Sequence, residues 1–293
     1  VGAPPDHYNQ LGQDWGQAPW RPDRLEDLSY APFRAMVAGN LRHSGGLRVD
    51  HIMGLFRLWW IPEGLPPTEG AYVRYNHEAM VGILLLEAQR AGALVVGEDL
   101  GTVEPWVRDY LRDRGILGTS GAWFEMQDGG VPLPPEAYRE YCMASVTTHD
   151  MPPTAGYLAL DHIRLQHSLG MLTESLDEEL ALAERTFDTW NRELVQRGFL
   201  VEGETDVAEK VLAMHRWIVA SPARVLCAAL TDAVGDRKTQ NQPGTVDEYP
   251  NWRVPLSGPD GEPLSLEEVF RSERAARLAA VMNDFSVHAI GRR

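Results

Sequence analysis

The chain is poor in cysteine, in long apolar runs and in positive charge, and each shortage excludes a class of protein. Its two cysteines, Cys142 and Cys227, are too few for a disulfide framework and fit a reducing cytoplasm. No apolar run approaches the roughly 20 residues that a membrane-spanning helix needs, and no signal-peptide pattern opens the chain. We therefore expect a cytoplasmic protein without a membrane partner.

The balance of charge argues against two further kinds of partner. The chain has 27 Lys and Arg against 42 Asp and Glu, which gives a formal net charge of −15 at pH 7. This excess disfavours binding to nucleic acid or to an acidic membrane surface, and it is compatible with a neutral substrate such as a sugar. No H-x-x-x-H or comparable ligand spacing is present, so we expect no metal site.

The apolar and aromatic content is that of a folded globular domain. Apolar residues make up 44% of the 293 residues, and nine are tryptophan. This length suffices for one large α/β domain or for part of a larger one. Because the chain begins VGAPPD, with Val1 in place of an initiator methionine, we expect an N-terminal portion to be absent.

Apolar patterns separated by Gly, Pro and polar clusters predict strands and helices in alternation. This order predicts a parallel sheet with helical crossovers. The predicted strands are 47–52, 93–97, one within 116–126, 144–148 and 224–230. The predicted helices are 31–42, 76–91, 104–114, 174–198, 205–219 and 264–283, and the main loops are 1–30, 56–61 and 238–255.

Carboxylates accompany the ends of three predicted strands, at Asp50, Glu98 and Asp150. Carboxylates at the C-terminal ends of parallel strands are typical of a (β/α)8 barrel active site. They can bind Mg²⁺ or Ca²⁺, or two can cleave a glycosidic bond as nucleophile and acid/base. Arg48 precedes Asp50 by two residues, on the same strand face, and would keep it ionised. The apolar run before Glu98 predicts a raised pKa for its carboxyl group.

Each of these residues also has a plain structural interpretation. Asp50 and its arginine can form a buried ion pair. Glu98 and Asp99 can complement the dipole of the following helix, and we assign that role to Asp99. His149 can be a satisfied core histidine, and Asp150 can cap the N-terminus of a helix.

Five stretches, in order along the chain, resemble motifs of the 4-α-glucanotransferases known as amylomaltases or disproportionating enzymes, in the α-amylase-like barrel clan. They are GAPPDHYNQLGQDWGQAPW (2–20), LRVDHIMGLFRLWWIP (47–62), VVGEDLGTV (95–103), TTHDMPPTAGY (147–157) and PGTVDEYPNWRVPL (243–256). Many members have T-H-D-N-D where this chain has Met151 and Pro152 after Asp150. The aspartate itself is kept.

The resemblance implies a fold. Residues 1–293 would be the C-terminal portion of a single (β/α)8 barrel domain, with the first strands missing. Residues 1–30 would form a loop that overhangs the active site.

The resemblance also implies a role for each matching residue. Asp50 would be the nucleophile, Glu98 the general acid/base and Asp150 the residue that stabilises the transition state. No organic cofactor is implied. The expected substrate-binding residues are Arg48, His149, Trp15, Gln13 and Asn251.

The expected activity is transfer of segments of α-1,4-glucans to glucose or maltooligosaccharide acceptors, by a retaining double displacement. One alternative is hydrolysis of the same glucans, which uses the same residues. A second is a non-catalytic glucan-binding fragment. The sequence indicates no oligomeric state.

Overall fold

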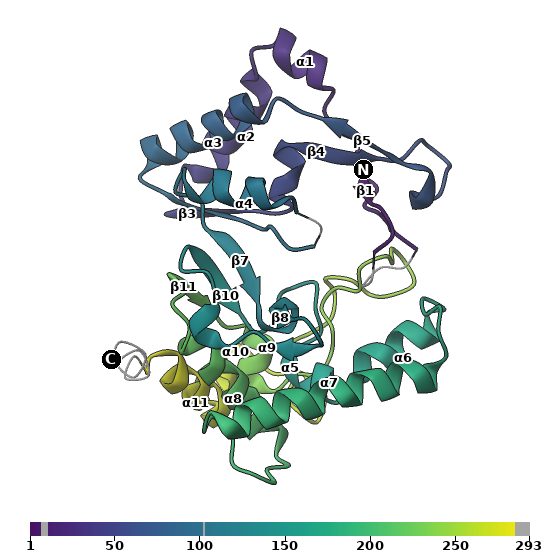
Figure 1. The fold of residues 1–293 in the computed structure, drawn as a ribbon, viewed down its shortest axis with the longest axis vertical. Coiled ribbons are helices and arrows are strands. Elements are labelled where there is room, and N and C mark those ends of the chain that lie inside the picture. Colours follow the sequence, from purple (N-terminus) through teal and green to yellow (C-terminus); the bar gives the residue numbers. More distant parts are fainter. Residues whose placement is uncertain (7–10, 102, 285–293) are drawn as a thin grey trace. The chain divides into compact units, whose positions relative to one another are not determined.

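The computed structural model describes residues 1–6, 11–101 and 103–284 of the chain (Figure 1). The residues divide into two compact units, Val1–Thr119 and a second unit that begins at Ser120. Each unit has its own hydrophobic core.

The first unit contains two small sheets. In one, β3 (Gly46–Val49) and β6 (Leu94–Gly97) pair in parallel with Val49 opposite Gly97, and Val96 forms a further parallel bridge with Leu117. The other is antiparallel, with the order β2–β1–β4–β5. Its strands are β1 (Gly2–Ala3), β2 (Gln13–Asp14), β4 (Arg57–Trp60) and β5 (Ala71–Arg74).

The described residues of the first unit also form four α-helices, and α2 lies beside α3 (Figure 1). Helix α3 begins after Asn76, whose side chain accepts a hydrogen bond from the Ala79 N–H. It ends at Gly92, whose φ of 63° is a left-handed conformation that glycine adopts without strain. The helices are α1 (Pro22–Asp27), α2 (Ala31–Leu41), α3 (His77–Ala91) and α4 (Pro105–Arg112), with 3₁₀ turns at Ile52–Leu55 and Pro67–Glu69.

The second unit contains a three-stranded sheet with the order β11–β10–β7, in which β10 and β11 pair in parallel. These strands are β7 (Gly118–Gly121), which runs across the boundary, β10 (Cys142–Ser145) and β11 (Val225–Cys227). Strands β8 (Met126–Gln127) and β9 (Val131–Pro132) form a short antiparallel pair.

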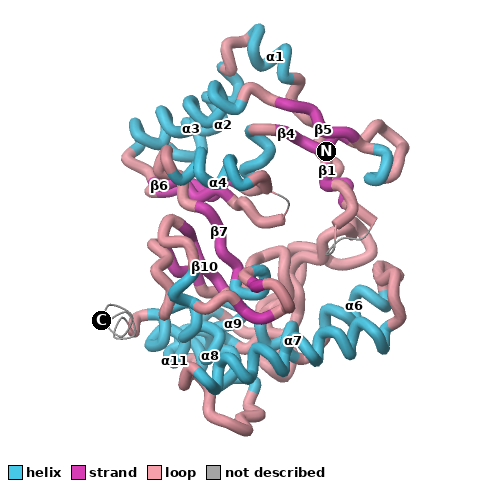
Figure 2. The backbone as a smooth tube through the Cα atoms, viewed as in Figure 1, coloured by secondary structure: helices cyan, strands magenta, loops and turns pink. Residues whose placement is uncertain are grey.

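Helices cover the sheet of the second unit, and α8 contacts α7, α11 and β10 (Figure 2). The core includes the fully buried indoles of Trp190 and Trp217, whose ring centroids lie 5.2 Å apart. The longest helix, α7, begins with a capping box between Ser175 and Glu178. The helices are α5 (Thr154–Leu158), α6 (Asp161–Ser168), α7 (Leu176–Gln196), α8 (Val207–Val219), α9 (Leu230–Val234), α10 (Leu266–Arg271) and α11 (Glu273–Met282), with 3₁₀ turns at Ala122–Phe124 and Pro135–Ala137.

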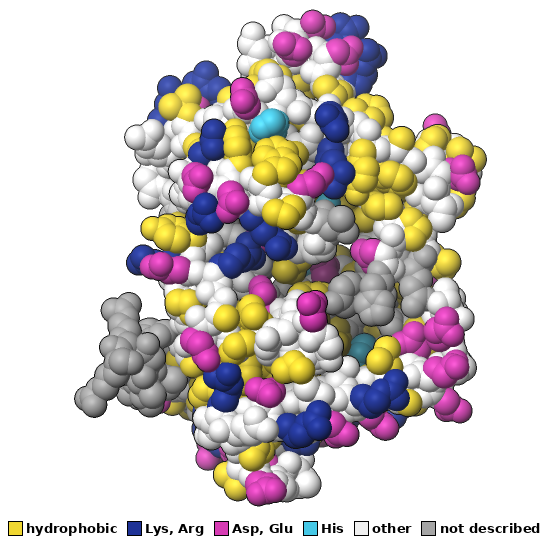
Figure 3. Space-filling model, in the orientation of Figure 1, with side chains coloured by type: hydrophobic (Ala, Val, Ile, Leu, Met, Phe, Trp, Pro, Cys, Tyr) yellow, Lys and Arg dark blue, Asp and Glu magenta, His cyan; other side chains and the backbone are white. Residues whose placement is uncertain are grey.

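The surface carries the excess of negative charge unevenly. On the face shown in Figure 3, acidic side chains gather where Figure 1 places α6 and α7. The first turn of α7 alone holds Asp177, Glu178 and Glu179. None of the helices in the described part of the chain has the length and apolar character needed to cross a membrane.

The mixed α/β content and the parallel pairing of predicted strands are confirmed. Several elements differ from expectation: the strand expected over 224–230 ends at Cys227, and the sequence patterns do not predict α5 and α6. The strand expected over 47–52 ends at Val49, and the expected connection 56–61 contains strand β4. The segment 1–30 contains β1, β2 and α1, and residues 7–10 of it lie outside the described residues. The helix expected over 264–283 is divided at Ser272, whose side chain caps α11.

Candidate active-site residues

In the first unit, the ends of β3 and β6 bring together the residues that follow them. Beyond the paired Val49 and Gly97, the Glu98 N–H donates to the Val49 carbonyl and the Ile52 N–H donates to the Glu98 carbonyl, each at 2.9 Å. A Cβ atom on Gly97 would lie only 2.9 Å from Cγ1 of Ile52. The glycine therefore lets the turn of residues 50–52 close over the end of β6.

Two backbone N–H groups hold the Glu98 carboxylate. The His51 N–H donates to Oε2 at 2.9 Å, and the Leu100 N–H donates to Oε1 at 2.6 Å. Burial raises the pKa of Glu98 and is the largest effect; the two N–H groups lower that pKa, and the nearby charge of Asp50 raises it again. The net shift is upward, as the apolar run before Glu98 predicts.

The expected contact between Arg48 and Asp50 is present. Nη1 of Arg48 lies 2.5 Å from Oδ1 of Asp50, and the carboxylate side chain is 64% exposed. Asp50 is therefore an accessible carboxylate held by one arginine, and the buried ion pair of the structural interpretation is not what the structure contains. Its environment is the opposite of that of Glu98, which is largely desolvated.

His51 connects Trp15 and Gln13 to the carboxylates. Its N–H bonds Glu98 and its ring contacts Trp15. The Trp15 indole N–H donates to Oε1 of Gln13 at 3.1 Å, and the Trp15 ring meets the His51 ring edge-on at a centroid distance of 5.1 Å. His51 is not among the predicted site residues. Its φ of 45° is unusual for a residue other than glycine and turns its N–H toward Glu98. Burial lowers the pKa of its imidazole.

Asp99 does not lie in the first turn of the following helix, contrary to the expectation that it complements the helix dipole. It is buried, it accepts a hydrogen bond from the Thr119 N–H at 2.8 Å, and its Oδ2 lies 3.5 Å from Nε of Arg108. Asp99 therefore ties the loop after β6 to the start of the next strand and to α4. Glu104 occupies the N-cap position of α4 without a capping side-chain bond.

In the second unit, His149 and Asp150 follow β10 on a loop. Nε2 of His149 lies 2.9 Å from Oδ2 of Asp150, and the side-chain amide of Asn241 donates to the other oxygen, Oδ1, at 2.7 Å. Asp150 does not cap α5, because the N-cap position belongs to Pro153. The His149 side chain is 38% exposed, so it is not a core histidine.

Asn251 uses its amide within its own loop. Its oxygen accepts a hydrogen bond from the Gln242 N–H at 2.8 Å, and its nitrogen donates to the hydroxyl oxygen of Thr245 at 2.9 Å. These bonds give Asn251 a structural role within its loop, and a substrate contact by Asn251 stays a prediction. The neighbouring Trp252, with a φ of 62°, is 63% exposed and lies 5.7 Å from the His149 ring.

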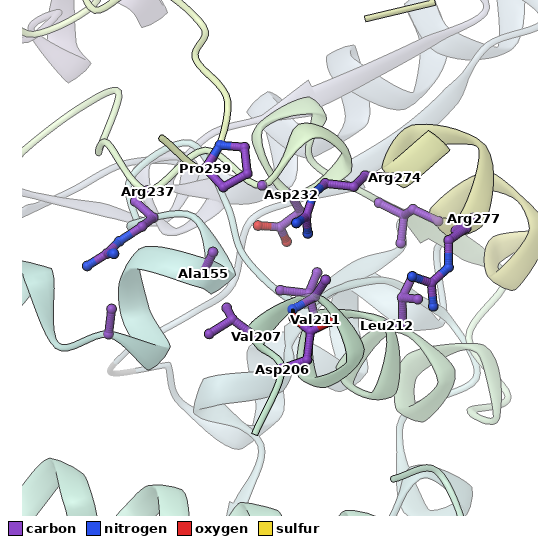
Figure 4. Close-up of a pocket in the computed structure, with 14 residues that line it drawn as sticks. Ala155, Asp206, Val207, Val211, Leu212, Asp232, Arg237, Pro259, Arg274 and Arg277 are labelled. Atoms are coloured by element: carbon purple, nitrogen blue, oxygen red, sulfur yellow. Dashed lines mark hydrogen bonds between the residues drawn. The ribbon is translucent and has the colours of Figure 1, made fainter. Parts of the chain in front are cut away.

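The pocket drawn in Figure 4 lies in the second unit and contains none of the predicted site residues. It has a volume of about 160 Å³ and is walled by α8, α9 and α11. Two of its arginines are already paired, Arg237 with Asp161 and Arg277 with Glu209. Its buried Asp232 accepts two hydrogen bonds from Thr154, and burial raises the pKa of that carboxyl group. These polar side chains of the pocket lining therefore already have partners within the protein, and their bonds link neighbouring segments.

Within either unit taken alone, the described residues bring no three His, Cys, Asp or Glu side chains together as metal ligands. Cys142 and Cys227 form no disulfide with each other in the described structure; Cys142 is buried and its Sγ lies 2.9 Å from the Arg139 carbonyl oxygen, whereas Cys227 is exposed.

Comparison with known proteins decides the family. A model of the 4-alpha-glucanotransferase family matches residues 1–260. The chain belongs to this family. The membership expected from the five motifs is confirmed, and each motif lies within the matched residues.

Curated 4-alpha-glucanotransferases align with most of the chain. The protein from Mycobacterium bovis is 63% identical over 284 residues, which cover 95% of this chain and 39% of that protein. The protein from Haemophilus influenzae is 32% identical, over 88% of this chain and 38% of that protein. The chain therefore spans about two fifths of the length of these relatives.

Solved structures of the 4-alpha-glucanotransferase family share the fold. The crystal structure of amylomaltase from Corynebacterium glutamicum matches 96% of this chain and 42% of its own, with a TM-score of 0.90 and 44% identity. An amylomaltase from Streptococcus agalactiae matches 97% of this chain and 50% of its own, with a TM-score of 0.70 at 17% identity, which is evidence of the fold alone.

Proposed function

We propose that the chain carries the catalytic residues of a 4-α-glucanotransferase that passes segments of α-1,4-glucans to glucose or maltooligosaccharide acceptors. The observation that carries the proposal is a pair of carboxylates in opposite environments after two paired strands. Asp50 is exposed and bound by Arg48, whereas the desolvated Glu98 has a raised pKa. A retaining glycosidase mechanism needs this division between an ionised nucleophile and a protonated acid.

The first step forms a covalent intermediate. A carboxylate oxygen of Asp50 attacks the anomeric carbon of the donor sugar, and the bond from that carbon to the glycosidic oxygen breaks. Glu98 gives its proton to the departing oxygen, which leaves as the 4-hydroxyl of the shortened glucan. The two backbone N–H groups on Glu98 then stabilise the carboxylate that remains.

The second step reverses the roles. Glu98 takes the proton from the 4-hydroxyl of the incoming acceptor, whose oxygen attacks the anomeric carbon and releases Asp50. Water in place of the acceptor would give hydrolysis instead. Transfer therefore requires that the site favour a sugar over water.

The remaining predicted residues bind and orient the glucan in this proposal. Asp150 stabilises the positive charge that develops on the sugar ring, and His149 donates a hydrogen bond to a sugar hydroxyl. Trp15, fixed by Gln13, offers the half-exposed aromatic face on which sugars stack. Asn251 stays a predicted substrate contact.

Two broader predictions accompany the activity. The assignment of residues 1–293 to the C-terminal part of a (β/α)8 barrel is supported by the parallel pairs β3–β6 and β10–β11. A role in glycogen or maltodextrin metabolism is a further prediction, and a cytoplasmic location is consistent with two cysteines that form no disulfide.

The test is product analysis with maltotriose, on this chain and on a version extended at its N-terminus. Longer maltooligosaccharides plus glucose support transfer, whereas glucose and maltose alone indicate hydrolysis. Binding of maltooligosaccharide without any product from either protein would favour the non-catalytic fragment.

Substitutions separate the two catalytic roles. Asp50→Asn and Glu98→Gln should each lower transfer from maltotriose by at least about 100-fold. With maltosyl fluoride as donor, the leaving fluoride needs no proton, so Glu98→Gln should still release fluoride while Asp50→Asn should not. Near-normal transfer by either variant from maltotriose would refute the assignment.

A further inference from the structure

In the loop that follows α9, the side chain of Asn241 contacts Asp150. Asn241 donates from its amide nitrogen to Oδ1 of Asp150 at 2.7 Å, and His149 lies 2.9 Å from Oδ2. The carboxylate is therefore held at both oxygens by side chains that approach from two different loops. An ionised carboxylate only accepts hydrogen bonds, so the group facing it must be the NH₂ end of Asn241.

The backbone on both sides of Asn241 is itself fixed. The Gln240 carbonyl accepts a hydrogen bond from the Trp252 N–H at 2.9 Å, and the Gln242 N–H donates to Oδ1 of Asn251 at 2.8 Å. The Tyr249 hydroxyl donates to the Thr239 carbonyl at 2.7 Å. The loop thus presents Asn241 from a braced segment, and these bonds explain why a long polar loop keeps a defined conformation.

We propose that Asn241 is a positioning residue, which holds the Asp150 carboxylate in the orientation that stabilises the transition state. The inference rests on the function proposed above for Asp150. A neutral amide is well suited to this task, because its donor does not change with pH and brings no charge that would compete with the sugar cation. His149 approaches Oδ2, and Asn241 adds a hydrogen bond to the other oxygen, which fixes the plane of the carboxylate.

The informative variant is Asn241→Asp, which keeps the shape and exchanges the donor for a second carboxylate. Near neutral pH two adjacent carboxylates repel, and Oδ1 of Asp150 loses the hydrogen bond that Asn241 donates. In acid the pair shares one proton, so an O–H group again bridges the two residues. Asn241→Ala removes the donor at every pH.

The expected result is a fall in kcat for transfer of about 10- to 100-fold in both variants at pH 7.5, with little change in KM. The ratio of kcat of Asn241→Asp to that of Asn241→Ala should then rise as the pH falls toward 5. Taking this ratio removes the pH dependence that Glu98 contributes to both variants.

Thr245→Val is the matched control for the loop. It removes the hydroxyl that bonds Asn251 and the Gln242 carbonyl, without touching Asp150 or adding a titrating group. Its kcat relative to wild type should not vary with pH. If Asn241→Asp behaves like this control, or if both Asn241 variants keep wild-type kcat, the positioning role is wrong.

A spectroscopic measurement separates this inference from the proposed function. The side-chain NH₂ resonances of Asn241 should shift as the Asp150 carboxylate is protonated, and Asp150→Ala should abolish that titration. If the wild type transfers no glucan yet the resonances titrate, the contact stands and the catalytic assignment fails. If transfer occurs and the resonances do not respond to Asp150, Asn241 does not hold the carboxylate.

Discussion

Gly97 offers the sharpest test of how the fold builds the first-unit site. It is the last residue of β6, and a Cβ atom there would lie 2.9 Å from Cγ1 and 3.0 Å from Cβ of Ile52. Real Cβ atoms essentially never approach other heavy atoms so closely, so Gly97→Ala forces Ile52 to move. Ile52 is fully buried and β-branched, and it has little freedom to rotate away.

The displacement acts directly on Glu98. The Ile52 N–H donates to the Glu98 carbonyl, and the preceding His51 N–H donates to the Glu98 carboxylate. Overpacking a core costs about 1–3 kcal/mol, and weakening a hydrogen bond to a charged group costs about 1.5–3 kcal/mol. With partial relaxation we expect Gly97→Ala to lower the free energy of unfolding by about 2–4 kcal/mol.

The matched control is Gly82→Ala in α3, where an added Cβ meets no atom within 4 Å. This exposed helical position should gain about 0.5–1 kcal/mol, because alanine favours the helix. Urea unfolding followed by tryptophan fluorescence measures both changes. The same chemical substitution should thus have opposite signs at two positions in one unit.

The activity of Gly97→Ala carries a second signature. The His51 N–H lowers the pKa of Glu98, so weakening that bond should raise this pKa further. The limb of the pH–rate profile that reports the acid/base should therefore move to higher pH. The reasoning would be refuted if the free energy of unfolding of Gly97→Ala lay within about 0.5 kcal/mol of the wild-type value. It would also be refuted if Gly97→Ala were destabilised but the acid/base limb of its pH–rate profile did not move.

Two further predictions concern the second unit. His162 stacks on Tyr157 at 4.3 Å, and burial lowers the pKa of His162 to about 4. The unfolded chain binds the proton near pH 6.5, so stability is full above that pH and falls by about 2–3 kcal/mol as the pH drops toward 4. His162→Phe should lose less stability than the wild type between pH 7 and pH 4.5, as measured by urea unfolding. An equal loss in the two proteins would contradict this prediction. The exposed Trp252 ring offers a face on which a sugar can stack. Trp252→Ala should therefore raise KM for maltotriose about 3- to 10-fold, while its free energy of unfolding stays within about 0.5 kcal/mol of the wild-type value. An unchanged KM would argue against sugar stacking on Trp252.

The elements around the first-unit carboxylates were largely predictable, because their signals are local. The continuous apolar run before Glu98 indicates a strand that is covered on both faces, as in a parallel sheet. Asn76 and Gly92 mark the two ends of α3 with side-chain and backbone chemistry that sequence shows directly. The raised pKa of Glu98 follows from the same apolar neighbours.

The turn after β3 was less predictable, because its geometry depends on a partner far along the chain. Residues 50–52 leave the strand since Ile52 packs on Gly97 and bonds to Glu98, nearly 50 residues away. Nothing local in His51 indicates a positive φ. The aromatic run 56–61 likewise reads as a connection until β5 pairs with it along its length and Gly2 pairs with Trp59, which makes it a strand of an antiparallel sheet.

Asn241 shows a further limit of sequence reasoning. Its neighbours form a polar stretch with no periodicity, and an asparagine there has the same local signal as Asn251, ten positions later. The structure gives the two residues different tasks, one toward Asp150 and the other inward to the loop. That difference comes from the bonds of Gln240 and Gln242, which aim the side chain between them at a carboxylate about 90 residues earlier. A motif can thus identify the charged residue, while the neutral residue that orients it becomes visible only when the loop is folded.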